Sequence, residues 1–203
     1  MSQKSFFWAS YADLMTSLFF IMLTLFVLTV VMLKKQAEAT ETELNKIREI
    51  QNAVSNIDST YFEYNEKHKK HILKIDVSFQ TGSADISNIN DSILVQLRNA
   101  GDTIQSFIQK TYEKYVGVQY LLIIEGQASK DSFLFNDELS YKRALALKKF
   151  WQESSIIFDP KQCEIIVSGS GVSGDLRIEP DIPENEKNQR FLIHILPKPG
   201  IIK

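Results

Sequence analysis

An uninterrupted apolar run near the N-terminus constrains this 203-residue chain more than any other feature. Residues 14–33 read LMTSLFFIMLTLFVLTVVML and contain no charged side chain. At about 1.5 Å per residue, a helix of this length spans the roughly 30 Å hydrocarbon core of a bilayer. Both expected membrane interfaces are marked, on one side by Lys34 and Lys35 and on the other by Phe6, Phe7, Trp8 and Tyr11. We therefore expect residues 1–35 to form a short tail and one transmembrane helix.

A cleaved signal peptide is the alternative interpretation of this run. Lys4 and the triplet Ala37-Glu38-Ala39 resemble the two ends of such a leader. However, the run is longer than the apolar part of a usual leader, and two lysines separate it from the alanines, so a retained anchor is favoured. The flanking lysines do not decide the orientation, because Lys4 on one side opposes Lys34 and Lys35 on the other.

The overall charge and the single cysteine exclude several classes of protein. A formal net charge of -2 gives no global basic field for binding nucleic acid. One cysteine, Cys163, excludes a disulfide framework and a cysteine-based zinc site, and its apolar surroundings indicate a buried side chain. His68 and His71 lie on a charged stretch without a ligand pattern, so we expect no metal. No nucleophile, base and acid stand at a defensible spacing, so we expect no enzyme activity and no cofactor.

Asp13 stands at the start of the apolar run, where a carboxylate is costly to place near hydrocarbon. At 3.6 residues per turn it shares one side of the helix with a stripe of small and polar residues: Ala9, Ser10, Thr16, Ser17 and Thr24. Such stripes let another helix approach and form hydrogen bonds. We expect Asp13 to face a protein partner or a hydrated slot and to exchange a proton there. The alternative is an interfacial acid among lipid headgroups.

The residues around Asp13 also carry a family resemblance. The segment from Phe7 to Thr16, FWASYADLMT, resembles the start of MotB-type stator subunits. The resemblance implies that Asp13 carries a proton or sodium ion, with Thr16 and Ser17 beside it. It also implies a cytoplasmic N-terminus, a periplasmic C-terminal domain, and an inner-membrane complex in which two such helices lie inside a ring of multi-span A-type subunits.

Residues 36–70 contain no proline or glycine and are predicted to be a helical linker. Ile47, Ile50, Val54 and Ile57 have the spacing of a coiled-coil seam, so we expect this linker to form a parallel homodimer. An amphipathic helix that packs on its own domain explains the same pattern about as well.

The remaining residues, 71–203, alternate between strand and helix patterns and predict an α+β domain, an α/β sandwich with one core. Strands are expected at 72–79, 118–125, 162–168 and 190–196. Helices are expected at 91–114 and 136–152.

The first turns of the second predicted helix carry another resemblance. Residues 135–144, FNDELSYKRA, follow the strand LLIIEG at 121–126 and resemble the signature of OmpA-like peptidoglycan-binding domains, with NQRF at 188–191 similar to a later strand. On this resemblance Asn136 caps the helix and offers an amide, Arg143 binds a peptide carboxylate, and Phe135 and Leu139 form apolar walls. Arg190 belongs to the later strand of the same site. The family carries an aspartate where this chain has Ser129, and Asp131 is the residue that reaches the pocket if the loop is shifted.

Together these features predict the B-type subunit of a proton-driven inner-membrane rotary motor that is anchored to peptidoglycan. Within the MotB-like proteins, the short N-terminal tail and compact wall domain look most like the B subunits of Zorya anti-phage defence systems. A flagellar-type stator subunit is the alternative within the class. A passive OmpA-like cell-wall tether without ion transport is the alternative outside it.

Overall fold

The computed structural model describes residues 3–80, 82–115, 118–131, 133–183 and 185–198. Inside the first helix, the side chains at 3–7, 9, 10 and 43 lie outside the described residues. These include the predicted interface residues Phe6 and Phe7 and the stripe residues Ala9 and Ser10. The chain divides into two compact units, Met1–Arg48 and Glu49–Lys203.

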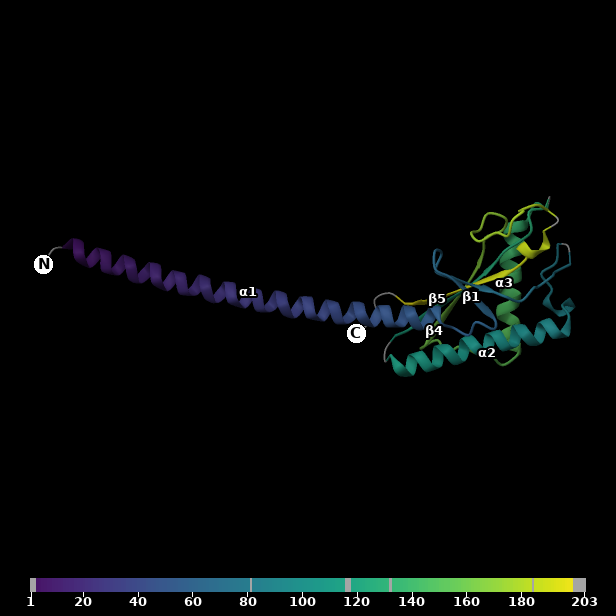
Figure 1. Ribbon diagram of the computed structural model, residues 1–203, viewed down its shortest axis with the longest axis horizontal. Helices are drawn as coiled ribbons and strands as arrows, with labels where there is room; N and C mark the ends of the chain where they lie inside the picture. Colours follow the sequence, from purple (N-terminus) through teal and green to yellow (C-terminus); the bar gives the residue numbers. More distant parts are fainter. Residues whose placement is uncertain (1–2, 81, 116–117, 132, 184, 199–203) are drawn as a thin grey trace. The chain divides into compact units, whose positions relative to one another are not determined.

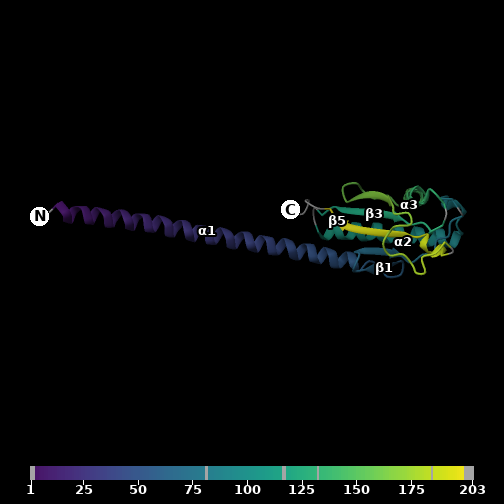
Figure 2. The ribbon, with the colours of Figure 1, turned by 90° about the horizontal axis from the view of Figure 1, so that it is seen from above.

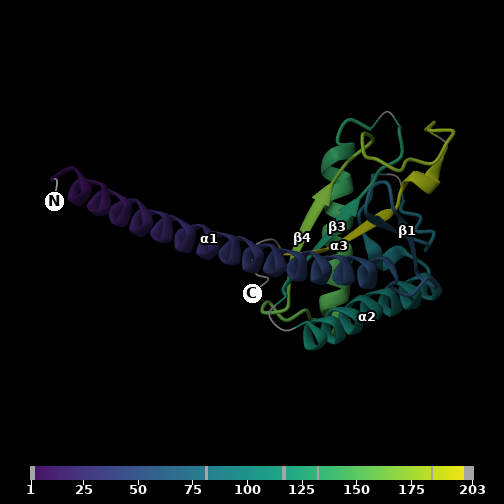
Figure 3. The same cartoon turned by 60° about the vertical axis from the view of Figure 1, so that its left-hand side comes forward.

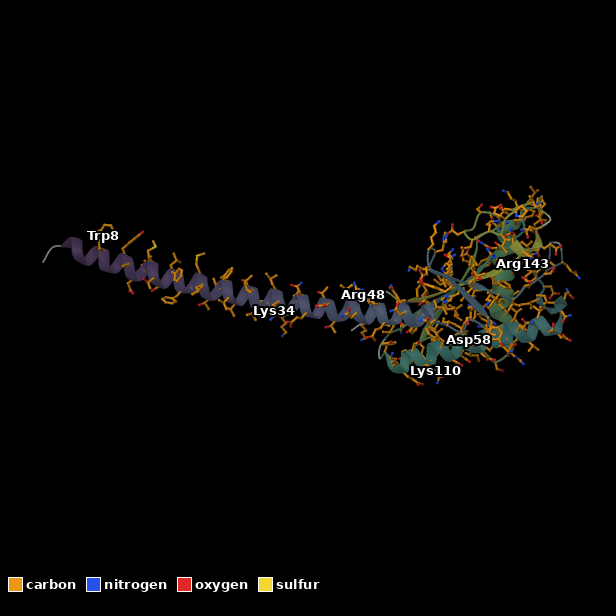
Figure 4. The ribbon with its side chains drawn as sticks, in the orientation of Figure 1. Trp8, Lys34, Arg48, Asp58, Lys110 and Arg143 are labelled. Carbon is orange, nitrogen blue, oxygen red and sulfur yellow. The ribbon has the colours of Figure 1, made fainter. Side chains whose placement is uncertain are left out.

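The first unit is part of one long helix, α1 (Gln3–Ser55), which contains the whole apolar run (Figure 1). Every side chain from Leu14 to Leu33 is exposed. Among the described residues, α1 is the one helix long and apolar enough to cross a membrane. Figure 4 labels Trp8 and Lys34, which lie on either side of the apolar run.

The second unit is built on a five-stranded mixed sheet with the order β1-β2-β5-β3-β4. Its strands are β1 (Phe62–Asn65), β2 (Lys70–Leu73), β3 (Tyr120–Gly126), β4 (Cys163–Gly169) and β5 (Phe191–Pro197). β3 and β4 run parallel, whereas β5 pairs antiparallel with both β2 and β3 (Figure 2). The helix α3 connects the parallel pair, as a parallel connection requires. This mixture of antiparallel pairs and one helical crossover makes the domain α+β, as the sequence predicts.

Two helices, α2 (Asp91–Lys114) and α3 (Asn136–Glu153), pack on one face of this sheet (Figure 3). The Asn90 side chain caps α2 by accepting a hydrogen bond from the Ser92 backbone N–H. The buried residues of α2, including Leu97, Ile104 and Ile108, recur at helical spacing and form its core-facing stripe. The Trp151 indole of α3 donates to the Leu97 carbonyl at 2.8 Å, which joins the two helices. Short 3-10 turns lie at Ile86–Asn88 and Glu186–Asn188.

The last turns of α1 belong to this same core. Ile50, Val54 and Ile57 are buried in the hydrophobic cluster of their own domain, and Ile47 is partly exposed. Three of the four residues expected to form a dimer seam therefore pack inside their own chain. The structure supports the second interpretation of the pattern, in which the helix packs on its own domain.

The linker and the first strand also differ from the prediction. The helix ends at Ser55, and β1 and β2 form a hairpin between residues 62 and 73 in place of a helix to residue 70. The domain begins at Glu49, inside the predicted linker. The predicted strand at 72–79 is paired only at its start. Beyond it, Ile75, Val77 and Phe79 are buried on alternate positions of an extended segment.

The other elements agree with their predicted ranges to within about two residues. Cys163 is buried, and burial raises the pKa of its thiol to about 12, as expected for a small apolar residue without chemistry.

Candidate functional site

A polar cluster lies where the carboxyl ends of β3 and β4 meet the first turns of α3. Gly126 and Gly169 end the two strands, and a Cβ at either position would collide with the backbone of α3 at Ser140 or Tyr141. The absence of these two side chains lets α3 begin directly against the sheet. Asp131 and Phe133, which precede this helix, are joined to its first residue by hydrogen bonds from the Asn136 amide.

Asp131 supplies the carboxylate of this cluster. Its Oδ1 accepts hydrogen bonds from Asn136 Nδ2 at 2.8 Å and from the Phe133 backbone N–H at 3.0 Å. Its Oδ2 lies 3.4 Å from the Ser129 hydroxyl. Desolvation opposes ionisation, but these hydrogen bonds and the charge of Arg143 together lower the pKa of Asp131 below its usual value. Asp131 thus carries a negative charge beside Ser129, where the OmpA-like signature has an aspartate.

Arg143 supplies the positive charge and is almost completely buried, with 2% of its surface exposed. Its Nε donates to the Ser83 carbonyl at 3.0 Å, and its guanidinium lies 4.6 Å from the centre of the Phe79 ring. Burial lowers the pKa of Arg143 to about 10, and the charge of Asp131 opposes this shift. The side chain therefore remains charged at neutral pH. Figure 4 labels Arg143 on α3.

Two polar atoms in this cluster are buried and have no hydrogen-bond partner among the described residues: Asn136 Oδ1 and Arg143 Nη1. Buried polar atoms in folded proteins are nearly always paired, so such atoms require an explanation. One is an acceptor and the other is a charged donor, and the Asp131 carboxylate belongs to the same cluster. The arrangement suits a ligand that carries an ammonium group or other N–H donor close to a carboxylate.

The structure brings together most of the residues that the sequence singled out. Ser129, Asp131, Asn136 and Arg143 form the cluster, and Leu139 is buried next to it, whereas Phe135 is 57% exposed. Asn136 does not cap α3 as expected. The N-cap position is Phe135, which makes no side-chain capping bond, and the Asn136 amide instead donates to Asp131 and to the Phe133 carbonyl.

Among the described residues, Arg190 makes no hydrogen bond to Ser129, Asp131, Asn136 or Arg143. Its Nε donates to Gln127 Oε1 at 3.0 Å, next to a groove between residues 72–78 and 186–190. The neighbouring residue Gln189 contacts the cluster instead. Gln189 Nε2 donates to Ser129 Oγ at 3.2 Å, and Gln189 Oε1 accepts from the Phe79 backbone N–H at 3.3 Å. Side chains of a strand alternate between its two faces, so the residue two positions before buried Phe191 lies on the same face. This rule would have selected Gln189, and not Arg190, as the site residue.

The first unit, Met1–Arg48, presents its own candidate group. Asp13, Thr16 and Ser17 have exposed side chains on α1. The Thr16 hydroxyl donates to the Ala12 carbonyl at 2.7 Å, and Thr24 donates in the same way to Phe20. These hydroxyl protons are satisfied within the helix, which leaves their oxygen atoms available as acceptors on the same side as Asp13.

Comparisons with known proteins give structural likenesses only. No family model and no curated protein sequence matches the chain. The periplasmic domain of MotB from Helicobacter pylori (residues 90–256) is similar with 18% identity and a TM-score of 0.44, covering 70% of this chain and 82% of that one. The OmpA-like domain of FopA1 from Francisella tularensis has 18% identity and a TM-score of 0.42, covering 67% of this chain and 79% of that one. An outer membrane protein from Borrelia burgdorferi has 24% identity and a TM-score of 0.41, covering 66% of this chain and 95% of that one.

Proposed function

We propose that this chain is a single-pass inner-membrane protein that binds peptidoglycan, and that it acts as the B-type subunit of a proton-driven rotary motor. The observation that carries the wall-binding function is the pair of buried, unpartnered atoms, Asn136 Oδ1 and Arg143 Nη1, next to the Asp131 carboxylate. The motif around Asp13 supports the motor function.

The chemistry of the cluster suits the diamino acid of a cell-wall stem peptide. Such a residue ends in an ammonium group and a carboxylate on one carbon. The carboxylate would accept from Arg143 Nη1, and the ammonium would donate to Asn136 Oδ1 and Asp131. Burial of both protein groups strengthens these hydrogen bonds, because little water competes for them. A ligand that lacks either charge would leave one buried atom unpaired.

In the membrane unit, Asp13 is the proposed proton carrier, with Thr16 and Ser17 beside it. A single acid that faces a partner can be loaded from one side of the membrane and unloaded to the other. Each change of charge at Asp13 biases the contacts between this helix and its neighbours, which is how an electrostatic switch produces motion. The wall-binding domain would hold the subunit still while the ring of A-type subunits turns around it. Two copies of the chain would enter one ring as a homodimer.

The finer proposal is that this motor serves Zorya anti-phage defence, and it rests on the resemblance of the tail and the SYADLMT segment. A neighbouring gene for a helicase or nuclease would support defence, whereas flagellar genes would support motility. A passive wall tether is favoured instead if the position of Asp13 near the N-terminal end of the apolar run reflects contact with headgroups.

The test is co-purification of the full chain with the multi-span protein encoded beside it, in wild type and Asp13→Asn. Thr29→Val is the control, because it removes a polar group about 160° around the helix from Asp13. We expect both variants to form the complex and only Asp13→Asn to abolish activity, measured as phage protection and as motility. If the chain purifies alone and Asp13→Asn is fully active, the motor function is wrong and the tether takes its place.

A further inference from the structure

Gln189 joins two segments that support opposite charges of the polar cluster. The residue is buried, with 8% of its surface exposed, and both polar atoms of its amide are paired. Nε2 donates to Ser129 Oγ at 3.2 Å, and Oε1 accepts from the Phe79 backbone N–H at 3.3 Å. Ser129 and Phe79 are distant in the sequence, so one amide fixes two separate parts of the site.

On the side of the negative charge, Gln189 determines which way the Ser129 hydroxyl donates. A hydroxyl group has one proton, and because Ser129 Oγ accepts from the Gln189 amide, that proton is free for another acceptor. Asp131 Oδ2 lies 3.4 Å from Ser129 Oγ and is this acceptor. The Gln189 amide is therefore the start of a chain of hydrogen bonds that ends at the Asp131 carboxylate.

On the side of the positive charge, Gln189 holds the aromatic residue that lies against Arg143. The centre of the Phe79 ring is 4.6 Å from the guanidinium. Among the described residues, the backbone of residues 75–79 makes no hydrogen bond to another backbone group. The Gln189 side chain is thus what fixes the Phe79 backbone, while an edge-to-face contact with Phe191, with centroids 6.0 Å apart, supports the ring.

We infer that Gln189 is a positioning residue that fixes the separation of Asp131 and Arg143, and that it thereby makes the site selective for a ligand with an ammonium group and a carboxylate on one carbon. This inference rests on the proposed function. The two charges of such a ligand are a fixed distance apart, so a site that binds both must hold its own charges within about 0.5 Å of the matching positions. A ligand with only one charge can shift within a looser site, so its affinity depends less on Gln189.

The test measures binding of three synthetic tripeptides to the detergent-solubilised full chain by calorimetry. All three begin with L-alanine and γ-linked D-glutamate. The third residue is meso-diaminopimelate, or lysine, which lacks its second carboxylate, or 2-aminopimelate, which lacks its second ammonium group. We expect wild type to bind the diaminopimelate probe on the order of ten-fold more tightly than either of the others. Gln189→Met removes both hydrogen bonds at similar side-chain length and should reduce both preferences to less than about three-fold.

Two further variants separate positioning from stability. Gln105→Met is the matched control, because the Gln105 amide also holds a backbone group, the Ile157 carbonyl at 2.6 Å, but Gln105 is on α2, outside the cluster. It should lower stability and leave both preferences unchanged. Ser129→Ala removes only the connection to Asp131, so it should reduce the preference over the 2-aminopimelate probe and keep the preference over the lysine probe. This variant tests the inference even if Gln189→Met fails to fold.

The ratios of the three affinities distinguish the outcomes. A variant that is merely less stable has a lower folded fraction, which weakens binding of all three probes by one factor and leaves their ratios unchanged. If Gln189→Met shows only such a uniform loss, or if Ser129→Ala keeps both preferences, the inference is wrong while the proposed wall-binding function stands. If wild type binds none of the probes, the proposed wall-binding function itself is wrong.

Discussion

Asp131 supplies the negative charge of the polar cluster from a loop. The Asp131 carboxylate lies within hydrogen-bond reach of both Ser129 and Asn136. Because the hydrogen bonds it receives outweigh desolvation, the pKa of Asp131 is lowered and the group remains ionised at neutral pH. The charge of Arg143, on α3, helps to keep the Asp131 carboxylate ionised, so the cluster contains a pair of opposite charges.

The first prediction concerns this carboxylate. Asp131→Asn should weaken binding of the diaminopimelate-containing peptide by roughly 10- to 100-fold, because it removes a charge-assisted hydrogen bond worth about 1.5–3 kcal/mol. Calorimetry on the full chain measures the change. Asp102→Asn, an exposed acid on α2, is the matched control and should bind as wild type does. Unchanged affinity in Asp131→Asn would mean that Asp131 only stabilises its own loop.

The second prediction concerns the shape of the cation. Arg143→Lys keeps a positive charge but loses the guanidinium fork, which both holds the Ser83 carbonyl and presents Nη1. We expect peptide affinity to fall at least ten-fold and the free energy of unfolding to fall by about 1–3 kcal/mol. Lys142→Arg, one residue earlier and 64% exposed, should change neither quantity. Full binding by Arg143→Lys would show that the contact does not need the guanidinium group.

At the scale of elements, α1 has two surfaces with different roles. Ile50 is fully buried in the core of the domain, whereas Leu44, less than two turns earlier, is 47% exposed. Ile50→Ala should lower the free energy of unfolding by about 2–5 kcal/mol, because it opens a cavity. Leu44→Ala should change it by less than about 0.5 kcal/mol. Both free energies of unfolding can be measured with denaturant in a Trp8→Phe background, where buried Trp151 is the fluorescent reporter. Equal losses of stability in the two variants would contradict the packing of α1.

His71 links the last turn of α1 to the sheet. Its Nε2 lies 2.9 Å from the Val54 carbonyl, and its Nδ1 is buried without a partner among the described residues. Burial, and to a lesser extent the neighbouring His194, lowers the pKa of His71, while backbone groups of Val54 and Ile193 oppose the shift. The unfolded chain therefore takes up the proton first as the pH falls.

From this shift we expect the domain to lose stability as the pH falls through about 6.5, the ordinary value for histidine, towards the lower pKa of the folded form. Glu125 does not titrate in this range, because its hydrogen bonds from His194 and Lys70 overcome desolvation and lower its pKa to about 2. Unfolding free energies measured from pH 7.5 to about pH 5 test the prediction. His71→Gln should flatten the profile.

At the scale of the whole molecule, the two units carry separable chemistry. Asp13 belongs to Met1–Arg48, and the polar cluster belongs to Glu49–Lys203. Arg143→Lys should therefore reduce retention on purified cell-wall sacculi and leave co-purification with the multi-span partner intact. Asp13→Asn should change neither retention on sacculi nor co-purification with the partner, although it abolishes activity. Loss of partner binding in Arg143→Lys would show that the two units depend on each other.

The sequence by itself determined the elements whose pattern is local. The uncharged run, the helical stripe of α2 and the apolar strands β3, β4 and β5 all lie where their periodicity predicts them, because periodicity reports which face of an element is buried. The candidate residues at the start of α3 also come together as predicted, because one helix fixes their spacing.

Only the tertiary structure decided which surfaces cover those faces and how the loops run. Ile50, Val54 and Ile57 show that a buried stripe has the same pattern whether its partner is a second chain or the chain's own sheet. The β1–β2 hairpin is short and carries several charged residues. It forms two strands because β2 also pairs with β5, which joins the hairpin to the sheet. Asp131 and Gln189 enter the site through loops whose course depends on contacts distant in the sequence, and a local pattern carries no information about such contacts.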